Sequence, residues 1–546
     1  MPITSRILEV AAADPDQLAI VGGPSGSPAH DESAHHAEGA KVPRSLTYAQ
    51  LVADSATMFA AVDALHRAQT DPPTPAPETH AIPITAVSLT SAFETSRIIA
   101  GLAGFRAVSA TIDPRWPLDH QVGVITTTGI GLVISDSPPL AEALVAAGWT
   151  GTVITATDIQ AREAAIDPAD TAPPTVREAH EPFLMLFSSG TTSNPKAFIK
   201  TRQQYRDNVA VSSAHLEPFA GVATLAPGPV SYSLTLYAVV ESLATGGSVH
   251  VADDFDPFTM GSRITGEAIT RVVAVPAVVK ALAEAARRTP ENFHGLDLVV
   301  TGGANLPASI RSALADVLPD ARLISYYGAA EIGFIGDSRD GDGTWISIYD
   351  TIGVEVRDES GARLPDGEIG TVWIHAAACS DGYVTGTTDA QLRRPDGWAT
   401  VGDQGRIENG LLQLAGRAGD IAITGGHKVS LPEVERAFEG FDREDPRSGK
   451  GRLGEVCAIA LPDDGLGSIV ALVIEPGALG SGSHAGDGES TLPDKAALLA
   501  QARAKLAPQF VPRRFYLVDR LPRTVGGKIR RHEAVDLVMS GKAQRL

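Results

Sequence analysis

Cysteine is almost absent from this 546-residue sequence, in which Cys379 and Cys457 are the only two. Two thiols do not make a disulfide framework, so we expect a reducing, cytoplasmic location and two small buried side chains rather than nucleophiles. Long apolar runs are also missing. No stretch approaches the 18 apolar residues of a membrane span, and the first residues lack the apolar core of a signal peptide. We therefore expect a soluble protein with no membrane partner.

Positive charge is scarce as well, because 45 Lys and Arg residues face 65 Asp and Glu residues, a formal net charge of −20. A field of that sign repels polyanions, which argues against nucleic acid as a partner, although a few local cations could still hold a nucleotide. The rest of the composition, with 43% hydrophobic and 20% charged residues, is typical of globular proteins. A chain of this length exceeds what one core supports, so we expect two or more domains.

Short apolar runs alternate with helical patterns from about residue 81 onward. ITAVSLT, GLVISD and GTVITA have the composition of buried parallel strands, and FETSRIIAGLAGFRA has the periodicity of a covering helix. This alternation predicts an α/β fold. After about Trp345 the strands become shorter and are separated by Gly, Asp and Pro, which favours an antiparallel or barrel-like section.

The last part of the sequence predicts a small, separately folded α+β unit. LPEVERAFEGF is expected to be a helix, followed by two strands at VCAIALPD and IVALVIEPG. A helix at TLPDKAALLAQARAKL and a strand at RRFYLVD complete it.

The strongest local signal is FLMLFSSGTTSNPKAFIK, Phe183–Lys200, where an apolar strand leads into a hydroxyl-rich loop and a lysine opens the next strand. Backbone N–H groups and hydroxyls can converge there on anionic oxygens, and Lys196 adds a positive charge. A Walker loop needs Gly where Pro195 stands and Ser or Thr where Ala197 stands, so this is a different kind of phosphate site. A merely polar strand connection is the alternative. The candidate phosphate-binding residues are Ser188, Ser189, Gly190, Thr191 and Thr192.

Here the sequence resembles the adenylate-forming superfamily of acyl-CoA synthetases, peptide-synthetase adenylation domains and firefly-type luciferases. Four more segments match family motifs in the family order: YYGAAE, Tyr326–Glu331; VGD, Val401–Asp403; GRAGDIAITGGHKVSLPEVE, Gly416–Glu435; and PRTVGGKIRR, Pro522–Arg531. The resemblance implies a large N-terminal domain of layered α/β subdomains plus the barrel-like section, residues 1–417, and a small, mobile α+β domain, residues 418–546. An acyl-adenylate would be bound between them.

The resemblance also implies roles for individual residues. Lys528, Lys196 and Glu331 would be catalytic, with Glu331 also the magnesium ligand. The nucleotide would be bound by Gly303, Ala304, Tyr327, Gly328, Ala329, Asp403 and Arg417 together with the phosphate loop, and the acyl group would lie against Tyr232, Ser233, Gly302 and Ala330. The hinge between the domains would be Gly419 and Asp420, and Gly425 and Gly426 would line the path of the coenzyme A thiol. Tight turns are the ordinary alternative for both glycine pairs.

Elementary chemistry supports the charged positions independently. A carboxylate that attacks the α-phosphate of ATP brings anion toward anion, so the site must supply positive charge and magnesium there. Lys528 and Lys196 meet that need, and one carboxylate such as Glu331 plus phosphates is a usual Mg²⁺ arrangement. Asp403 can accept hydrogen bonds from vicinal hydroxyls while Arg417 offers a fork of donors. Surface ion pairs are the ordinary alternative for such residues.

Three positions depart from the family pattern. Ser193 and Ala197 stand where relatives usually carry glycine, and Ala330 stands where they carry threonine. A lost hydroxyl that donates to a charged phosphate costs about 1.5–3 kcal/mol. The phosphate loop serves chiefly the first half-reaction, so we hypothesise that adenylation is weakened and that thioesterification of an acyl-adenylate dominates, with an upstream adenylating ligase as one source of it.

The sequence thus predicts an acyl-CoA ligase. Its substrates would be a carboxylic acid or its acyl-adenylate, ATP and coenzyme A, with Mg²⁺ as the cofactor. One alternative is an adenylating enzyme that loads a free-standing carrier protein, and another is a non-catalytic sensor of acyl groups or nucleotides. The identity of the acid does not follow from these residues.

Overall fold

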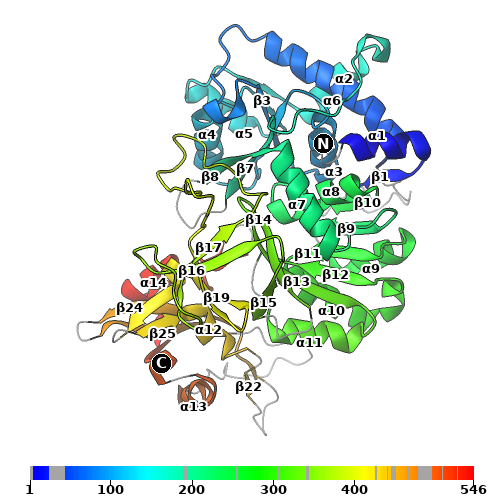
Figure 1. The fold of residues 1–546 in the computed structure, drawn as a ribbon. Helices are drawn as coiled ribbons and strands as arrows, with labels where there is room; N and C mark the ends of the chain where they lie inside the picture. Colours follow the sequence, from blue (N-terminus) through cyan, green and yellow to red (C-terminus); the bar gives the residue numbers. More distant parts are fainter. Residues whose placement is uncertain are drawn as a thin grey trace, which may run out of the picture.

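The computed structural model describes residues 4–23, 44–188, 195–253, 256–303, 306–339, 344–424, 427–439, 441–443, 451–463, 466–476, 495–506, 508–524 and 527–546. Within them, a six-stranded and a thirteen-stranded sheet, both covered by helices, precede a second six-stranded sheet near the end of the chain (Figure 1). Both cysteines are buried. In this part of the chain, no helix combines the length and the apolar character that crossing a membrane requires.

The first sheet has the parallel character that the apolar runs predict. In the described residues its order is β6-β5-β3-β4-β7-β8, and only β8 runs antiparallel to its neighbour. Every residue of β3, β4 and β5 is buried, because helices cover the sheet. The strands are β3 Ile84–Ser88, β4 Val108–Thr111, β5 Leu132–Ser135, β6 Thr152–Ile154, β7 Pro182–Ser188 and β8 Lys196–Thr201, and the helices are α2 Tyr48–Arg67, α3 Ala92–Leu102, α4 Leu118–Thr127, α5 Pro138–Ala146 and α6 Ala156–Ala164.

The second sheet is much longer and changes character along its length. Thirteen described strands follow the order β16-β17-β18-β19-β15-β14-β13-β12-β11-β9-β10-β1-β2. Its parallel part comprises β1 Leu18–Val21, β9 Ala223–Pro227, β10 Ser248–Ala252, β11 Arg271–Ala274, β12 Leu298–Thr301 and β13 Arg322–Ala329, with β2 Ser45–Thr47 antiparallel at its edge. The associated helices are α1 Thr4–Ala13, α7 Arg202–His215, α8 Ser233–Thr245, α9 Pro257–Gly266, α10 Pro276–Arg288 and α11 Ala308–Val317.

The strands near and after Trp345 are antiparallel, as their short length and Gly-rich connections predict. They are β14 Gly333–Ser338, β15 Trp345–Ile348, β16 Gly353–Arg357, β17 Gly370–His375, β18 Asp403–Glu408 and β19 Leu411–Arg417. This section continues directly from the parallel strands, since β14 pairs with β13 on one side and with β15 on the other. The β18–β19 pair thereby lies in the same sheet as β13, whose end carries the Tyr326–Glu331 motif.

The C-terminal unit begins after the short 3-10 turn Ala418–Asp420. Its sheet pairs β21-β20-β25-β26-β27, with β24 also on β25, and it lies beside β16–β19 in Figure 1. The helix expected over residues 431–441 ends at Arg436, and the next residues form turns. The elements are β20 Ile421–Thr424, β21 His427–Ser430, β24 Glu455–Asp463, β25 Gly467–Glu475, β26 Arg514–Leu517, β27 Gln544–Arg545, α12 Leu431–Arg436, α13 Lys495–Lys505 and α14 Arg531–Met539, and β22 Asp442–Arg443 pairs with β23 Gly451–Arg452.

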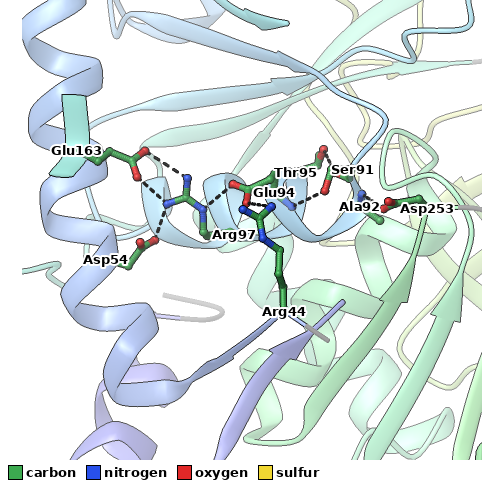
Figure 2. Close-up of polar contacts among 9 residues, drawn as sticks. All are labelled: Arg44, Asp54, Ser91, Ala92, Glu94, Thr95, Arg97, Glu163 and Asp253. Carbon is green, nitrogen blue, oxygen red and sulfur yellow. Dashed lines mark hydrogen bonds and ion pairs between the residues drawn. The ribbon is translucent and has the colours of Figure 1, made fainter. Parts of the chain in front are cut away.

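Local signals start the helices nearest the functional motifs. Thr201 and Gln204 form a capping box that starts α7 directly after β8. Ser91 caps α3, whose Arg97 lies among carboxylates of three helices (Figure 2). Gly246, with φ +85°, ends α8 in the left-handed region that glycine favours.

Candidate active site

The β18–β19 pair and the end of β13 bring three polar side chains together. Asp403 in β18 pairs directly with Arg417 in β19, and Arg417 Nε donates to Asp403 Oδ1 over 3.2 Å. Tyr327 Oη donates to Asp403 Oδ2 over 2.7 Å. Burial, together with the Asp403 charge, raises the pKa of Tyr327 well above its usual value. The phenol therefore stays a neutral donor, and both oxygens of Asp403 are held in place.

Lys528, in the C-terminal unit, is influenced electrostatically by this pair. Its position is set by a turn in which Thr524 N donates to Lys528 O over 2.7 Å and Gly527 adopts φ +79°. Partial desolvation lowers the pKa of Lys528, the Arg417 charge lowers it further and the Asp403 charge opposes this, although the residue as a whole is exposed. The amine of Lys528 thus lies within electrostatic range of both Arg417 and Asp403.

Glu331 forms the second half of the charged cluster, in the turn between β13 and β14. Its side chain is buried, and Tyr383 Oη donates to its Oε1 over 3.3 Å. Lys196 Nζ lies 5.2 Å from the centre of the same Tyr383 ring. Burial raises the pKa of Glu331, while the charges of Arg417 and Lys200 oppose the increase. Because Arg417 influences both Glu331 and Lys528, the two halves form one electrostatic site.

Lys200, on β8, supports the site from within the protein. Its Nζ donates to the backbone oxygen of Glu331 over 2.8 Å and to that of Ala378 over 2.6 Å. Complete burial lowers the pKa of Lys200 to about 8, and the nearby groups Cys379, Glu331 and Asp381 act in the opposite sense. The ammonium is therefore satisfied by main-chain carbonyls rather than by a paired carboxylate.

The residues fit a magnesium ion that takes most of its ligands from elsewhere. No group of three or more His, Cys, Asp and Glu side chains able to hold a metal occurs among the residues described. Glu331 instead offers one carboxylate, disfavoured as an anion by burial and hydrogen-bonded by its own backbone N–H and, over 3.3 Å, by Tyr383 Oη. A hard cation beside it would compensate that charge, and phosphate and water oxygens would complete its shell.

The small residues around β12 and β13 have identifiable packing reasons. A Cβ built on Gly302 would lie 2.3 Å from Tyr326 Cζ, so Gly302 is required by the partly buried Tyr326 ring. Gly303 has φ +79° and open space around its missing side chain. A Cβ on Gly328 would lie 2.7 Å from the oxygen of Gly333. The predicted acyl-pocket and adenine residues Ala329 and Ala330 are both partly buried.

Tyr232, which precedes α8 of the second sheet, is held by a loop of the first sheet. It occupies the N-cap position of α8, ahead of the exposed Ser233, and its hydroxyl hydrogen-bonds with Asp113, which follows β4. Arg115 Nη2 donates to Asp113 over 2.8 Å, and its guanidinium lies 5.7 Å from the Tyr232 ring centre. Burial, with the Asp113 charge, raises the pKa of Tyr232 to about 12. The aromatic ring is thus fixed between the two sheets.

Asp420 links the predicted hinge to both of its flanks. Its Oδ2 accepts from Arg417 N over 3.0 Å, and its Oδ1 accepts from Arg531 Nε over 2.7 Å. Arg531 also contacts Glu435 and the Ala458 oxygen. A Cβ built on the neighbouring residue, Gly419, would meet no atom within 4 Å.

Several predicted residues lie outside the described part of the chain. They are Ser189, Gly190, Thr191, Thr192 and the divergent Ser193 in the phosphate loop, Ala304 after β12, and Gly425 and Gly426. The two ends of the phosphate loop are described. Ser188 ends β7 and pairs with Lys196, which begins β8.

Sequence reasoning missed four contributors: Lys200, Tyr383, Asp113 and Arg115. A lysine inside the apolar strand AFIK was the available signal for Lys200, because a buried lysine needs a polar partner. Asp113 and Arg115 follow β4, and Tyr383 lies in the loop between β17 and β18, none of them in a recognisable motif. Only the meeting of segments far apart in sequence reveals their contacts.

Comparisons with known proteins concern the family and the fold. The family model for AMP-binding enzymes matches residues 86–384. The chain is 30% identical over 433 residues to a salicylyl-CoA synthase / salicylate adenylyltransferase of a Streptomyces species, covering 75% of this chain and 73% of that protein. It is 27% identical over 382 residues to a feruloyl-CoA synthase of an Amycolatopsis species, covering 67% and 72%.

A solved structure shares the fold over nearly the whole length. ATP-bound MatB from Rhodopseudomonas palustris superposes with a TM-score of 0.78 at 20% identity, covering 98% of this chain and 99% of that one. That likeness concerns the fold, a large domain followed by a smaller one. Taken with the family model, it means that this chain belongs to the adenylate-forming AMP-binding enzymes.

Proposed function

We propose that this enzyme is an acyl-CoA ligase, which joins a carboxylic acid to coenzyme A through an acyl-adenylate. The observation that carries the proposal is the hydrogen-bonded group of Tyr327, Asp403 and Arg417, whose charged members also act electrostatically on Lys528. It offers the carboxylate and guanidinium suited to a ribose, and a cation of the C-terminal unit lies within their electrostatic range. The similar enzymes named for salicylyl-CoA and feruloyl-CoA support the choice of acceptor.

In the first half-reaction, a carboxylate oxygen attacks the α-phosphorus of ATP and the bond to pyrophosphate breaks. Negative charge accumulates on the phosphoryl oxygens, where the cations Lys528 and Lys196 would stabilise it. Asp403 would accept hydrogen bonds from the ribose hydroxyls, held in position by Tyr327. Glu331 would hold Mg²⁺, which when bound neutralises phosphate charge.

In the second half-reaction, the thiol of coenzyme A attacks the acyl carbon and AMP leaves with both electrons of the broken C–O bond. The thiol loses its proton in this step. Rotation of residues 418–546 about Gly419 and Asp420 would withdraw Lys528 and bring Gly425 and Gly426 to the site. Such a hinge would let one site carry out both adenylation and thioesterification.

Adenylation is proposed to be the weaker half. The reason is the sequence departures Ser193, Ala197 and Ala330. The test compares acyl-CoA formation from acid plus ATP with formation from synthetic acyl-AMP. A large preference for acyl-AMP is expected, and equal efficiency by both routes would refute the weakened half-reaction while leaving the ligase proposal intact.

Aromatic carboxylic acids are the first substrates to try, since two similar enzymes are named for salicylate and ferulate. A panel of aliphatic, aromatic and polycyclic acyl-AMP analogues, ranked by binding affinity, tests this choice. Tighter binding of aliphatic members would contradict it.

A carrier protein is the alternative acceptor, and parallel assays with coenzyme A and with a pantetheine-bearing carrier would distinguish the two. A non-catalytic sensor would bind the same ligands without turnover. Lys528, Glu331 and Asp403 together weigh against a sensor, and product formation that Lys528→Ala abolishes without loss of AMP binding would exclude it.

A further inference from the structure

We infer that Lys200 is a positioning residue that orients Glu331, and with it the Mg²⁺·ATP complex, during adenylation. This inference rests on the proposed function. Lys200 contacts neither nucleotide nor acid in the arrangement proposed above. It acts through the main chain of two segments that meet at the site.

The burial of Lys200 is unusual for its residue type. Its exposed fraction is 2%, and lysine is almost never fully buried unless it is paired. Methionine or leucine would fill the same volume without the cost of desolvating a charge. The charge therefore points to a requirement for hydrogen bonds of fixed direction at this place.

The two acceptors identify that requirement. Glu331 and Ala378 are separated from Lys200 by 131 and 178 residues, and one ammonium joins them. The oxygen of Glu331 also accepts from Ser380 N over 2.8 Å. Lys200 and Ser380 thus fix the peptide that carries the Glu331 side chain.

The carboxylate itself accepts a hydrogen bond from the backbone N–H of Glu331, which belongs to the same main chain. Among the contacts of the described residues, its hydrogen bond from another side chain is the 3.3 Å contact with Tyr383. Tyr383 belongs to the same loop as Ala378, and this loop is tied to β8 by a bridge between Phe198 and Tyr383. The orientation of the Glu331 carboxylate therefore depends on the main chain that Lys200 holds in place.

The alternating side-chain directions of β8 explain how one strand both presents the phosphate-binding lysine and supports Glu331. Lys196, Phe198 and Lys200 occupy alternate positions and share one face of the strand. Lys196 lies against the Tyr383 ring, Phe198 is fully buried, and Lys200 reaches the main chain behind Glu331. The strand that presents the phosphate-binding lysine thereby also aligns the proposed magnesium ligand.

The test replaces Lys200 by methionine, which keeps the chain length but has no donors. Lys200→Met is expected to weaken Mg²⁺·ATP binding in calorimetry about tenfold, and to raise the Mg²⁺ concentration for half-maximal adenylation by a similar factor, since small misplacements of positioned groups are costly. AMP binding and thioesterification of synthetic acyl-AMP should stay within about threefold of wild type, because neither needs this metal site.

Arg202 provides a matched control only two residues away. It is also buried and donates to the main-chain oxygens of Ala103 and Phe105, as well as to the Glu181 carboxylate, but not to the main chain of Glu331. Arg202→Met should lower thermal stability without altering the Mg²⁺ dependence. Lys200→Gln, whose amide still donates to one carbonyl, should lie between wild type and Lys200→Met, and it provides the test if the methionine variant fails to fold.

The outcomes distinguish the positioning role of Lys200 from the proposed ligase function. Unchanged Mg²⁺·ATP binding in the Lys200 variants, or equal losses in both half-reactions, would overturn the positioning role. Failure of the wild-type enzyme to form acyl-CoA by either route would instead refute the proposed function. The calorimetric comparison would still test the role of Lys200 in Mg²⁺·ATP binding.

Discussion

At the scale of single residues, Lys528 is the side chain on which the proposed chemistry most depends. Its substitution by alanine should lower adenylation by about 10²-fold or more, as removal of a transition-state charge contact does in other enzymes. AMP affinity and the use of synthetic acyl-AMP should change little. Pyrophosphate release and AMP titration measure the two effects.

The charge of Lys528 also predicts a pH dependence. Partial desolvation and Arg417 lower the pKa of Lys528, against the effect of Asp403. The protonated amine is the active form, so adenylation should decline with rising pH before the range of an ordinary lysine is reached, near 10.4. Lys528→Arg should retain its charge and lack this decline. A decline that survives in the arginine variant would assign it to another group.

A second residue makes the fold sensitive to acid. Burial lowers the pKa of His66 to about 4, and the ring shares a 2.9 Å hydrogen bond with Thr85. The unfolded chain, with a pKa near 6.5, binds more protons than the folded chain between these values. Stability should therefore be lost as pH falls from about 6.5 toward 4, by up to about 3 kcal/mol from this group.

Denaturant titrations at pH 7 and pH 5 measure that loss. His66→Gln should make the loss smaller than in wild type, whereas His532→Gln should not, because the side chain of His532 is 58% exposed. Equal loss in wild type and His66→Gln would show that other groups carry the acid sensitivity.

The functional residues in the motifs could be predicted from the sequence, but the side chains that hold them in position could not. Asp403 and Arg417 follow from two short motifs, and the β18–β19 register brings them together. Lys200 and Tyr383 have no such pattern, since their partners come from loops more than 50 residues away. A sequence motif identifies the residues that face a ligand. The residues that hold them in place are identified only by their neighbours in the folded structure.

At the scale of elements, an ion cluster joins three helices of the first sheet. Figure 2 shows Arg97 of α3 between Glu94, Asp54 of α2 and Glu163 of α6. Arg97 Nη1 lies 2.8 Å from both Asp54 Oδ2 and Glu163 Oε2, and Nε lies 2.9 Å from Glu94 Oε2. Arg44 adds a second cation on Glu94. The helices are thus tied by charge as well as by apolar packing.

Removing the central cation should be far more costly than removing one carboxylate. Arg97→Met leaves buried acids without their partner and should destabilise the fold by about 3–5 kcal/mol. Burial raises the pKa of Glu163 despite Arg97, so Glu163→Gln, which carries no charge, should cost much less. Denaturant unfolding compares the two variants, and a cost for Glu163→Gln as large as that for Arg97→Met would contradict this account.

Element types could be predicted where periodicity and composition agree. β3, β5 and β6 are expected from uninterrupted apolar runs; all three are parallel, and β3 and β5 are fully buried. The helix at Leu431 is shorter than its pattern suggested, because the chain turns after Arg436. Strand order was not predictable, since the joining of β14 to β13 depends on pairing between distant segments.

At the scale of the whole molecule, the proposed mechanism requires the C-terminal unit to hold Lys528 toward Asp403 during adenylation, and the charge of Asp403 acts on Lys528 in this structure. Asp420 helps to hold this unit: one carboxylate receives the Arg417 N–H from the end of β19 and the Arg531 guanidinium from α14. Ser430 also donates to the Ala415 oxygen across the predicted boundary. The proposed rotation must break or rearrange such contacts.

Asp420→Ala should therefore affect the two half-reactions unequally. Loss of both hydrogen bonds should weaken the hold on Lys528 and lower adenylation about tenfold, as imperfect positioning does. Thioesterification from synthetic acyl-AMP should fall less than threefold, because the rotated arrangement does not require this contact. Equal losses in Asp420→Ala would mean that Asp420 stabilises the C-terminal unit as a whole rather than one orientation of it.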